Sequence, residues 1–238
     1  MKLTIVGCSP AWPNPGGGQS GYLVDAGGTL LLDCGPGVLA RLRQGGGWPS
    51  VDAIAITHFH LDHWGDLVPW AWGAMYGPGA KAERPELWLP PGGQKTLQGF
   101  GERLGFVDMF DTTFAVNEYA DGQAFRAAGL EVTPLRVPHY ELLNFGLRVS
   151  NGLRSLAYSG DSAPSPQLEE LARDVDLFLC EATLAQEEQG LRGHLTADEA
   201  VAAFARSGAR RLLVIHRPHE LPLREQLERA YDGFELNV

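Results

Sequence analysis

One short segment constrains this chain more than any other. The six residues from His58 to His63, with the sequence HFHLDH, bring together three imidazoles and a carboxylate directly after the apolar run Val51 to Ile56. Such a run is typical of a buried strand, so these polar groups leave a rigid scaffold where the strand ends. Imidazole and carboxylate are preferred ligands of zinc and similar divalent ions, and a site without thiolates is more often catalytic than structural. The alternative is a polar loop with satisfied histidines, which a single histidine would favour.

Alternation along the segment sends most of these side chains roughly one way, and the turn that follows brings His63 back. The segment therefore predicts two adjacent metal ions, whose other ligands come from distant parts of the chain. The candidates are His139, Asp161 and His216, each of which follows a strand-like run. Taken singly, Asp161 is also consistent with an ordinary turn aspartate, and each histidine with a satisfied core residue. Their repetition at strand ends favours a shared site.

Strand-like runs separated by Gly- and Pro-rich turns open the chain, and strands and helices alternate in its second half. We therefore predict a layered α/β domain with mixed sheets, and a single domain over residues 1–238 because no repeat or linker divides it. The predicted strands are Leu3–Val6, Tyr22–Asp25, Thr29–Asp33, Val51–Thr57, Glu86–Leu89, Thr112–Val116, Glu131–Val137, Phe145–Val149, Leu153–Tyr158, Asp176–Cys180 and Arg211–Ile215. The predicted helices are Pro36–Arg43, Trp64–Tyr76, Gly93–Leu104, Gln167–Ala172, Thr196–Ser207, which begins with a capping box, and Leu223–Tyr231.

The charge of the chain excludes several classes of function. The 19 Lys and Arg residues stand against 29 Asp and Glu residues, a net charge of −10, which disfavours a broad basic face for long nucleic acids. The three cysteines are far apart and form no C-x-x-C pair, so neither a disulfide framework nor a cysteine zinc site is expected. No stretch predicts a membrane span or a signal peptide. We expect a cytoplasmic protein without a membrane partner.

Three further motifs accompany the histidine segment, namely Thr4–Ser9, Gln19–Val24 and Leu31–Gly37. With them, the chain resembles the metallo-β-lactamase superfamily, and within it the ribonuclease Z-like branch of phosphodiesterases. The resemblance implies an αββα sandwich of two mixed sheets, with helices on the outer faces and a dinuclear centre at one edge. By the same resemblance, Asp161 bridges two ions, the first held by His58, His60 and His139 and the second by Asp62, His63 and His216.

Two more elements are similar to that branch. Cys180-Glu181-Ala182-Thr183 ends a strand-like run, and Gly193-His194-Leu195-Thr196 precedes the capped helix. In the branch, the corresponding Glu and His form an additional acid pair, and a carboxylate bonded to an imidazole fixes its tautomer and raises its basicity. The alternative makes Glu181 a surface acid and His194 part of a helix-start turn. It leaves a charged residue after an apolar run without a partner.

These observations lead to the hypothesis of a hydrolase that attacks a small phosphodiester with a metal-bound hydroxide. Its two divalent ions are expected to be zinc, with manganese as the alternative. Asp62 orients this hydroxide, and His194, held by Glu181, protonates the leaving oxygen. Ribonuclease Z proper carries a long arm that grips tRNA, inserted between the residues that match His139 and Asp161. Only 21 residues lie between these two positions in this chain, so tRNA is not the expected substrate. The resemblance also implies a homodimer.

Several alternatives stay open. The same centre could hydrolyse a carboxylic ester, lactone, thioester or β-lactam, process RNA 3′ ends, or serve a non-catalytic scaffold. Electron-transfer chemistry is not expected, because the iron-dependent members of the superfamily that this chain resembles have Glu at the position of His60. Asp33 either orients a metal ligand or caps the helix near Pro36, and Arg217 is a candidate to neutralise a substrate phosphate. Four aromatic residues either wall a pocket or belong to the core: Trp64, Trp70, Trp72 and Tyr76.

Overall fold

Alternating burial along the first strands builds a sheet with two covered faces. In β3, Leu30 and Leu32 point into the centre of the molecule, whereas Leu31 points to the opposite face and packs beneath helices. This sheet has seven strands in the order β13-β1-β2-β3-β4-β5-β6. Its strands are β1 (Lys2–Gly7), β2 (Gly21–Asp25), β3 (Thr29–Leu32), β4 (Ala53–Ala55), β5 (Glu86–Leu89), β6 (Ala115–Glu118) and β13 (Glu235–Asn237).

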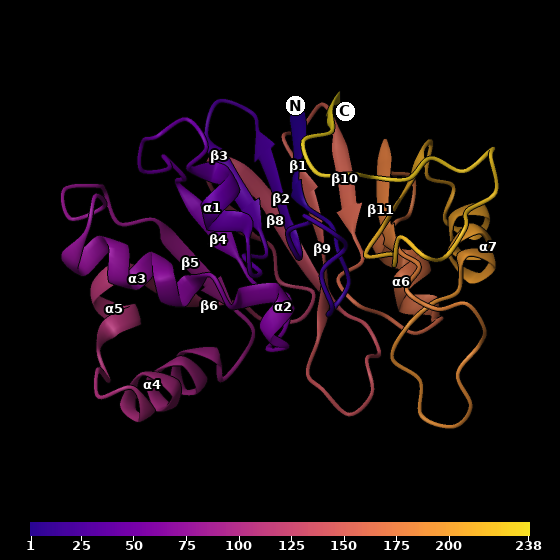
Figure 1. Cartoon of the computed structure of the whole chain (residues 1–238). Coiled ribbons are helices and arrows are strands. Elements are labelled where there is room, and N and C mark those ends of the chain that lie inside the picture. Colours follow the sequence, from indigo (N-terminus) through magenta and orange to yellow (C-terminus); the bar gives the residue numbers. More distant parts are fainter.

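A second sheet of six strands, in the order β12-β11-β10-β9-β8-β7, packs against the first one. Antiparallel pairing joins β7 to β10, and parallel pairing joins β10, β11 and β12. The computed structural model describes residues 1–238, and Figure 1 shows the two sheets at its centre. The strands are β7 (Phe125–Ala127), β8 (Leu130–Arg136), β9 (Phe145–Ser150), β10 (Ser155–Tyr158), β11 (Leu177–Glu181) and β12 (Leu212–Ile215).

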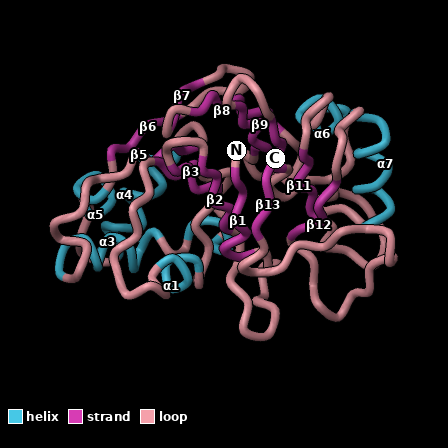
Figure 2. Tube along the Cα trace, turned by 90° about the horizontal axis from the view of Figure 1, so that it is seen from above, coloured by secondary structure: helices cyan, strands magenta, loops and turns pink.

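Helices cover the outer face of each sheet. Figure 2 shows one helical group beside the first sheet and a second group beside β11 and β12, and each group buries its own apolar cluster. The layers are therefore helix, sheet, sheet and helix, which confirms the predicted αββα sandwich. The first group comprises α1 (Val38–Leu42), α2 (Leu61–Trp64), α3 (Leu67–Tyr76), α4 (Gly93–Arg103) and α5 (Met109–Thr113); the second comprises α6 (Pro166–Leu171) and α7 (Ala197–Ser207).

The capping box that begins α7 is confirmed, because the Thr196 hydroxyl accepts from the Glu199 N–H and the Glu199 carboxylate accepts from the Thr196 N–H. The two chain ends lie together, since β1 pairs with β13 and Leu3 stands opposite Leu236 (Figure 2). None of the helices has the length and apolar character needed to cross a bilayer.

Two of the predicted elements are wrong. The segment Leu223–Tyr231 is not a helix, because its backbone pairs with β12: the Val214 N–H donates to the Glu228 carbonyl, and the Ala230 N–H donates back to the Val214 carbonyl. The predicted strand Thr112–Val116 begins instead as the last turns of α5 and becomes strand only at β6. In both places, contacts from distant parts of the chain override the local apolar pattern.

Candidate metal centre

Polar residues leave the carboxyl ends of several strands at one edge of the sandwich. Asp33 follows β3 and His58 follows β4, two strands that run parallel. Asp161 and His216 follow β10 and β12, and Glu181 ends β11 between them. Because parallel strands end at the same edge of a sheet, the fold itself gathers these side chains.

Asp33 and His216 have left-handed backbones, with φ of 58° and 50°. Non-glycine residues rarely adopt this conformation, which the surrounding contacts must therefore hold. At both positions the tight turn points a polar side chain back over the end of its strand.

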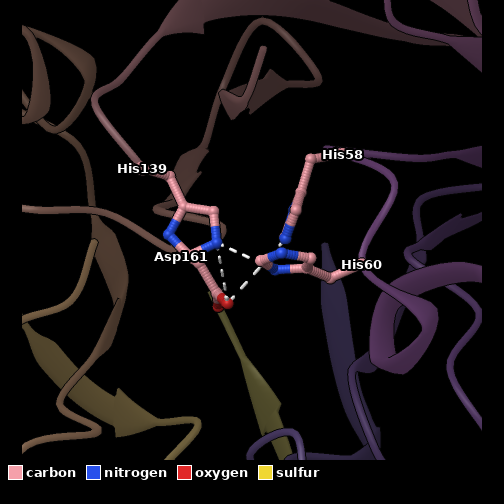
Figure 3. A group of neighbouring side chains, drawn as sticks. All are labelled: His58, His60, His139 and Asp161. Atoms are coloured by element: carbon pink, nitrogen blue, oxygen red, sulfur yellow. Dashed lines mark hydrogen bonds and ion pairs between the residues drawn. The ribbon is translucent and has the colours of Figure 1, made fainter. Parts of the chain in front are cut away.

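The first donor group contains His58, His60, His139 and Asp161. Their ligand atoms lie within 4.8 Å of one another, and Figure 3 shows His139 and Asp161 approaching His58 and His60, which share one segment. His139 Nε2 is 3.0 Å from His60 Nδ1 and 3.8 Å from Asp161 Oδ2, and His58 Nε2 is 3.9 Å from the same oxygen. Donor atoms that share a tetrahedral zinc ion are about 3.3 Å apart, as follows from zinc–nitrogen bonds of about 2.0 Å. The group has the dimensions of one such site.

The second donor group contains Asp62, His63, Asp161 and His216, all buried. His63 Nε2 is 3.4 Å from Asp62 Oδ2 and 3.3 Å from Asp161 Oδ1, and His216 Nε2 is 3.1 Å from Asp62 Oδ2. Asp161 belongs to both groups, with Oδ2 facing the first and Oδ1 facing the second. The structure thus brings together all seven residues that the sequence singled out as ligands.

Three buried polar atoms support the fit of metal ions to this centre. His58 Nε2, His63 Nε2 and Asp161 Oδ1 have no hydrogen-bond partner. A buried polar atom without a partner destabilises a fold by about 1–3 kcal/mol, so such atoms are normally satisfied. All three face the donor groups, where divalent cations would accept their lone pairs.

The protonation states also suit metal binding in the first group. Burial lowers the pKa of His58 well below its ordinary value and lowers the pKa values of His60 and His139 as well. Burial alone would raise the pKa of Asp161, but His216 and His63 outweigh it and hold that pKa well below its ordinary value. Neutral imidazoles and an ionised carboxylate are the forms that bind metal.

A polar network orients His63 from behind. Asp33 Oδ2 is 2.6 Å from His63 Nδ1, and the same carboxylate accepts hydrogen bonds from the Tyr158 hydroxyl at 2.6 Å and the Thr57 N–H at 2.8 Å. Burial lowers the pKa of His63, but Asp161 and Asp33 outweigh it and raise this pKa well above its ordinary value. A carboxylate behind a ligating imidazole fixes its tautomer and ring orientation. The capping alternative for Asp33 is wrong, because Gly37 is the N-cap of α1.

Glu181 and His194 form the pair that the sequence suggested. His194 Nδ1 is 2.9 Å from Glu181 Oε1, and the other carboxylate oxygen accepts a hydrogen bond of 2.8 Å from the Thr183 hydroxyl. Burial lowers the pKa of His194, but the charge and hydrogen bond of Glu181 raise it to about 9. The His194 ring centroid lies 4.9 Å from that of His139 and 6.0 Å from that of His216, so the pair borders both donor groups.

For four aromatic residues the sequence left two alternatives open, a pocket wall or the core, and the structure favours the second. Trp64 and Trp70 are buried in the cluster under the first helical group, and the Trp64 indole donates to the Phe59 carbonyl. Trp72 and Tyr76 stack on each other on α3, to one side of the strand ends (Figure 1). They therefore belong to the core and to the helical surface.

Arg217 does not face the centre either. Its guanidinium is buried and donates to the backbone carbonyls of Ala182 at 2.6 Å, Leu221 at 3.2 Å and Pro222 at 2.7 Å. The proposed contact of Arg217 with a substrate phosphate is therefore wrong, because this side chain anchors the chain after β12.

Two residues beside the centre escaped sequence analysis. Tyr140 follows His139 directly, and Glu188 accepts a hydrogen bond from its hydroxyl at 2.5 Å. Neither residue belongs to a repeated pattern, and 48 positions separate them. The only local signal was the position of Tyr140 next to a ligand candidate.

The chain is similar in sequence to a known family and to several bacterial proteins. The profile described as beta-lactamase superfamily domain matches residues 29–217. The uncharacterized protein Rv1339 of Mycobacterium tuberculosis is 34% identical over 223 residues, covering 92% of this chain and 81% of that protein. The probable metallo-hydrolase YhfI of Bacillus subtilis is 26% identical, covering 100% and 96%. Ribonuclease Z of Myxococcus xanthus is 28% identical, covering 100% and 98%.

Solved structures share the fold. The crystal structure of YhfI superposes with a TM-score of 0.85 at 22% identity, covering 99% of this chain and 98% of that chain. A diphosphatase from the PhnP family superposes with a TM-score of 0.77 at 21% identity, covering 100% and 97%. The profile match over most of the length and the relative above 30% identity establish the family, and the chain belongs to the β-lactamase superfamily as a metal-dependent hydrolase.

Proposed function

We propose that this hydrolase uses two divalent ions to cleave a small phosphodiester. Both ions are zinc in this proposal, and manganese is the alternative metal. The observation that carries the proposal is the Glu181–His194 pair, which belongs to neither of the two donor groups but borders both and clusters with His216 of the second group. Hydrolysis of a diester needs an acid for the leaving oxygen as well as a nucleophile. Among the relatives, one is named ribonuclease Z and a structural neighbour is a diphosphatase, and both names refer to phosphate esters or anhydrides.

The donor groups assign the ligands. His58, His60 and His139 would hold one ion, and Asp161 would reach both ions through its two oxygens. Three further side chains would hold the other ion: Asp62, His63 and His216. When bound, two such cations supply an activated water nucleophile at neutral pH and stabilise charge on the phosphoryl oxygens. The nitrogen and oxygen donor set, without thiolates, is suited to zinc and also to manganese.

The side chains around the ligands carry the proton transfers. His194 Nδ1 is occupied by Glu181, so Nε2 is the nitrogen that carries a proton to the leaving oxygen. Glu181 holds this imidazole and stabilises its charged form. Asp62 orients the attacking water through a hydrogen bond, in addition to its part in the second donor group.

A small substrate suits the surroundings of the centre. Between His139 and Asp161 the chain forms a turn at Tyr140 and Glu141, the strands β9 and β10 and the tight turn at Asn151, with no arm. The net charge of −10 also opposes a long polyanion. We place the protein in the cytoplasm, where its three buried thiols stay reduced, and expect a homodimer.

The test is a substrate panel with the zinc-loaded protein. It compares bis(p-nitrophenyl) phosphate, a cyclic nucleotide, p-nitrophenyl phosphate, p-nitrophenyl acetate, a lactone and pre-tRNA. We expect diester turnover to exceed that of the monoester and the carboxylic esters by about 10²-fold or more. The cyclic nucleotide tests the acid itself, because its alkoxide leaving oxygen needs a proton whereas p-nitrophenolate does not. Faster turnover of the acetate or the lactone would instead support the carboxylic-ester alternative.

The salt dependence of kcat/KM distinguishes a small substrate from a long one. For a small diester, kcat/KM is expected to change little between about 50 and 200 mM salt, because a single phosphate group has no condensed counterions to release. Efficient cleavage of pre-tRNA with a much steeper salt dependence would contradict the small-substrate proposal.

A further inference from the structure

An aromatic side chain at the edge of the centre has no role in the chemistry described above. Tyr140 follows the ligand candidate His139, and its ring centroid lies 5.0 Å from that of His139 and 5.7 Å from that of His194. Its backbone is left-handed, with φ of 49°. A bulky residue rarely adopts this conformation, and such outliers concentrate where a ligand must be held.

A set of hydrogen bonds holds Tyr140 in place. Its N–H donates to the Arg192 carbonyl at 3.0 Å, and its hydroxyl donates to Glu188 Oε1 at 2.5 Å. The other oxygen of Glu188 accepts from the backbone N–H groups of Gly193 at 2.8 Å and His194 at 3.2 Å. One carboxylate therefore fixes the tyrosine ring relative to the backbone of the proposed general acid.

The ring also depends on a glycine. A Cβ atom at Gly193 would lie only 2.2 Å from a ring carbon of Tyr140, so the ring occupies the space that any larger residue would fill. With its hydroxyl bonded and this side covered, Tyr140 is still 38% exposed. Part of a ring with restricted freedom therefore remains accessible beside His194.

We propose that the ring of Tyr140 binds an aromatic ring or nucleobase on the substrate, so that the diester is an aryl or nucleotide ester. The proposal rests on the phosphodiesterase function and names its substrate class. A flat ring pre-positioned next to His194 contacts a flat ester group with little further loss of side-chain freedom, and stacking needs no positive charge from this acidic protein. Purely alkyl esters would leave the tyrosine ring exposed.

Binding is measured in the His194→Ala background, in which loss of the proposed acid slows hydrolysis of the esters. The zinc-loaded protein is titrated calorimetrically with diphenyl phosphate and with diethyl phosphate, which carry the same charge. With wild-type Tyr140 it is expected to prefer the diphenyl ester, and Tyr140→Ala to weaken that ester by about 5–150-fold, the range of one lost stacking contact. Affinity for the diethyl ester is expected to stay within about twofold, since no stacking is lost there. Tyr140→Phe keeps the preference because it keeps the ring.

The controls separate binding from support of the fold. Tyr76→Ala, at an exposed tyrosine on α3, is expected to change neither affinity. Tyr140→Leu serves as a second ring-free variant, and zinc content is measured throughout. No wild-type preference for the diphenyl ester, an equal loss for both esters, or a loss of zinc in both ring-free variants would overturn the proposal. Failure of the wild type to hydrolyse any phosphodiester would contradict the proposed function, while the ester preference would still report on Tyr140.

Discussion

The two donor groups differ in how the protein holds them. In the first group His60 is only partly buried, and His139 Nδ1 donates to a backbone carbonyl, that of Gly193, at 2.7 Å. In the second group every member is buried, and His63 is oriented by the carboxylate of Asp33. We call the first half open, because His60 is partly exposed and a main-chain carbonyl orients His139, and the second half closed, because all its members are buried and a carboxylate orients His63.

This difference indicates that the two halves bind metal with different affinity and differ in their access to solvent. A closed half with a carboxylate behind its imidazole is organised before metal arrives, so it should hold its ion more tightly. The open half is the one in which a ligand candidate, His60, is partly accessible to solvent. Glu181 and His194 lie along the border between the halves, where a leaving group would depart.

The largest expected effect comes from removing the carboxylate that links the two halves. Asp161→Asn removes the one carboxylate that both halves share, so both ions should bind weakly. We expect kcat/KM for bis(p-nitrophenyl) phosphate to fall by about 10³-fold or more, since metal ions supply several kcal/mol of transition-state stabilisation. Asp66→Asn, at another buried aspartate that accepts the Leu39 N–H at 2.7 Å, should keep both ions. Wild-type metal content in Asp161→Asn would show that the two halves work independently.

The border between the halves is tested by His194→Ala. We expect turnover to fall by about 10²-fold or more while metal content stays unchanged, as for the loss of a general acid. The loss should be greatest for substrates with poor leaving groups. The matched control is His219→Ala, because His219 is half-exposed and pairs only with Glu220. If His194→Ala loses metal, the residue is a ligand; if turnover is unchanged, it only shapes the loop before α7.

A smaller effect distinguishes the closed half from the open one. Asp33→Asn should weaken the second ion by about 10–100-fold, the usual consequence of removing the partner of a ligating histidine, and leave the first ion unchanged. Tyr158→Phe removes one hydrogen bond to the same carboxylate and should act in the same direction but less strongly. Competition with a chelator measures both affinities. Equal weakening of the two ions would remove the distinction between the halves.

The residues alone predicted a layered α/β domain with mixed sheets, and the resemblance to the superfamily implied the αββα sandwich, which the structure confirms. The distant ligand candidates could be found because each lies within three residues of the end of an apolar strand, so one local pattern marks positions that are distant in the chain. His139 and His216 could be found in this way, although 76 residues lie between them. Glu181 stood out for a related reason, as a charge at the end of a buried run.

The remaining features depend on contacts that no local pattern records. Arg217 was assigned to the substrate because of its place next to a ligand candidate, whereas three carbonyls from other segments bind its guanidinium. Leu223–Tyr231 has apolar spacing that fits a helix, but its backbone pairs with β12. The short strands β7 and β13 were missed because each consists of three residues and exists only through its partner strand.

Metal stoichiometry tests the central claim most directly. Protein purified without chelators is reconstituted with zinc or manganese, and the bound metal is quantified by elemental analysis while a chelator removes it stepwise. Seven ligands in two linked groups predict two ions per chain, with the ion of the closed half lost last. One ion or fewer per chain, with no gain on adding either metal, would contradict the dinuclear centre on which the proposed function depends.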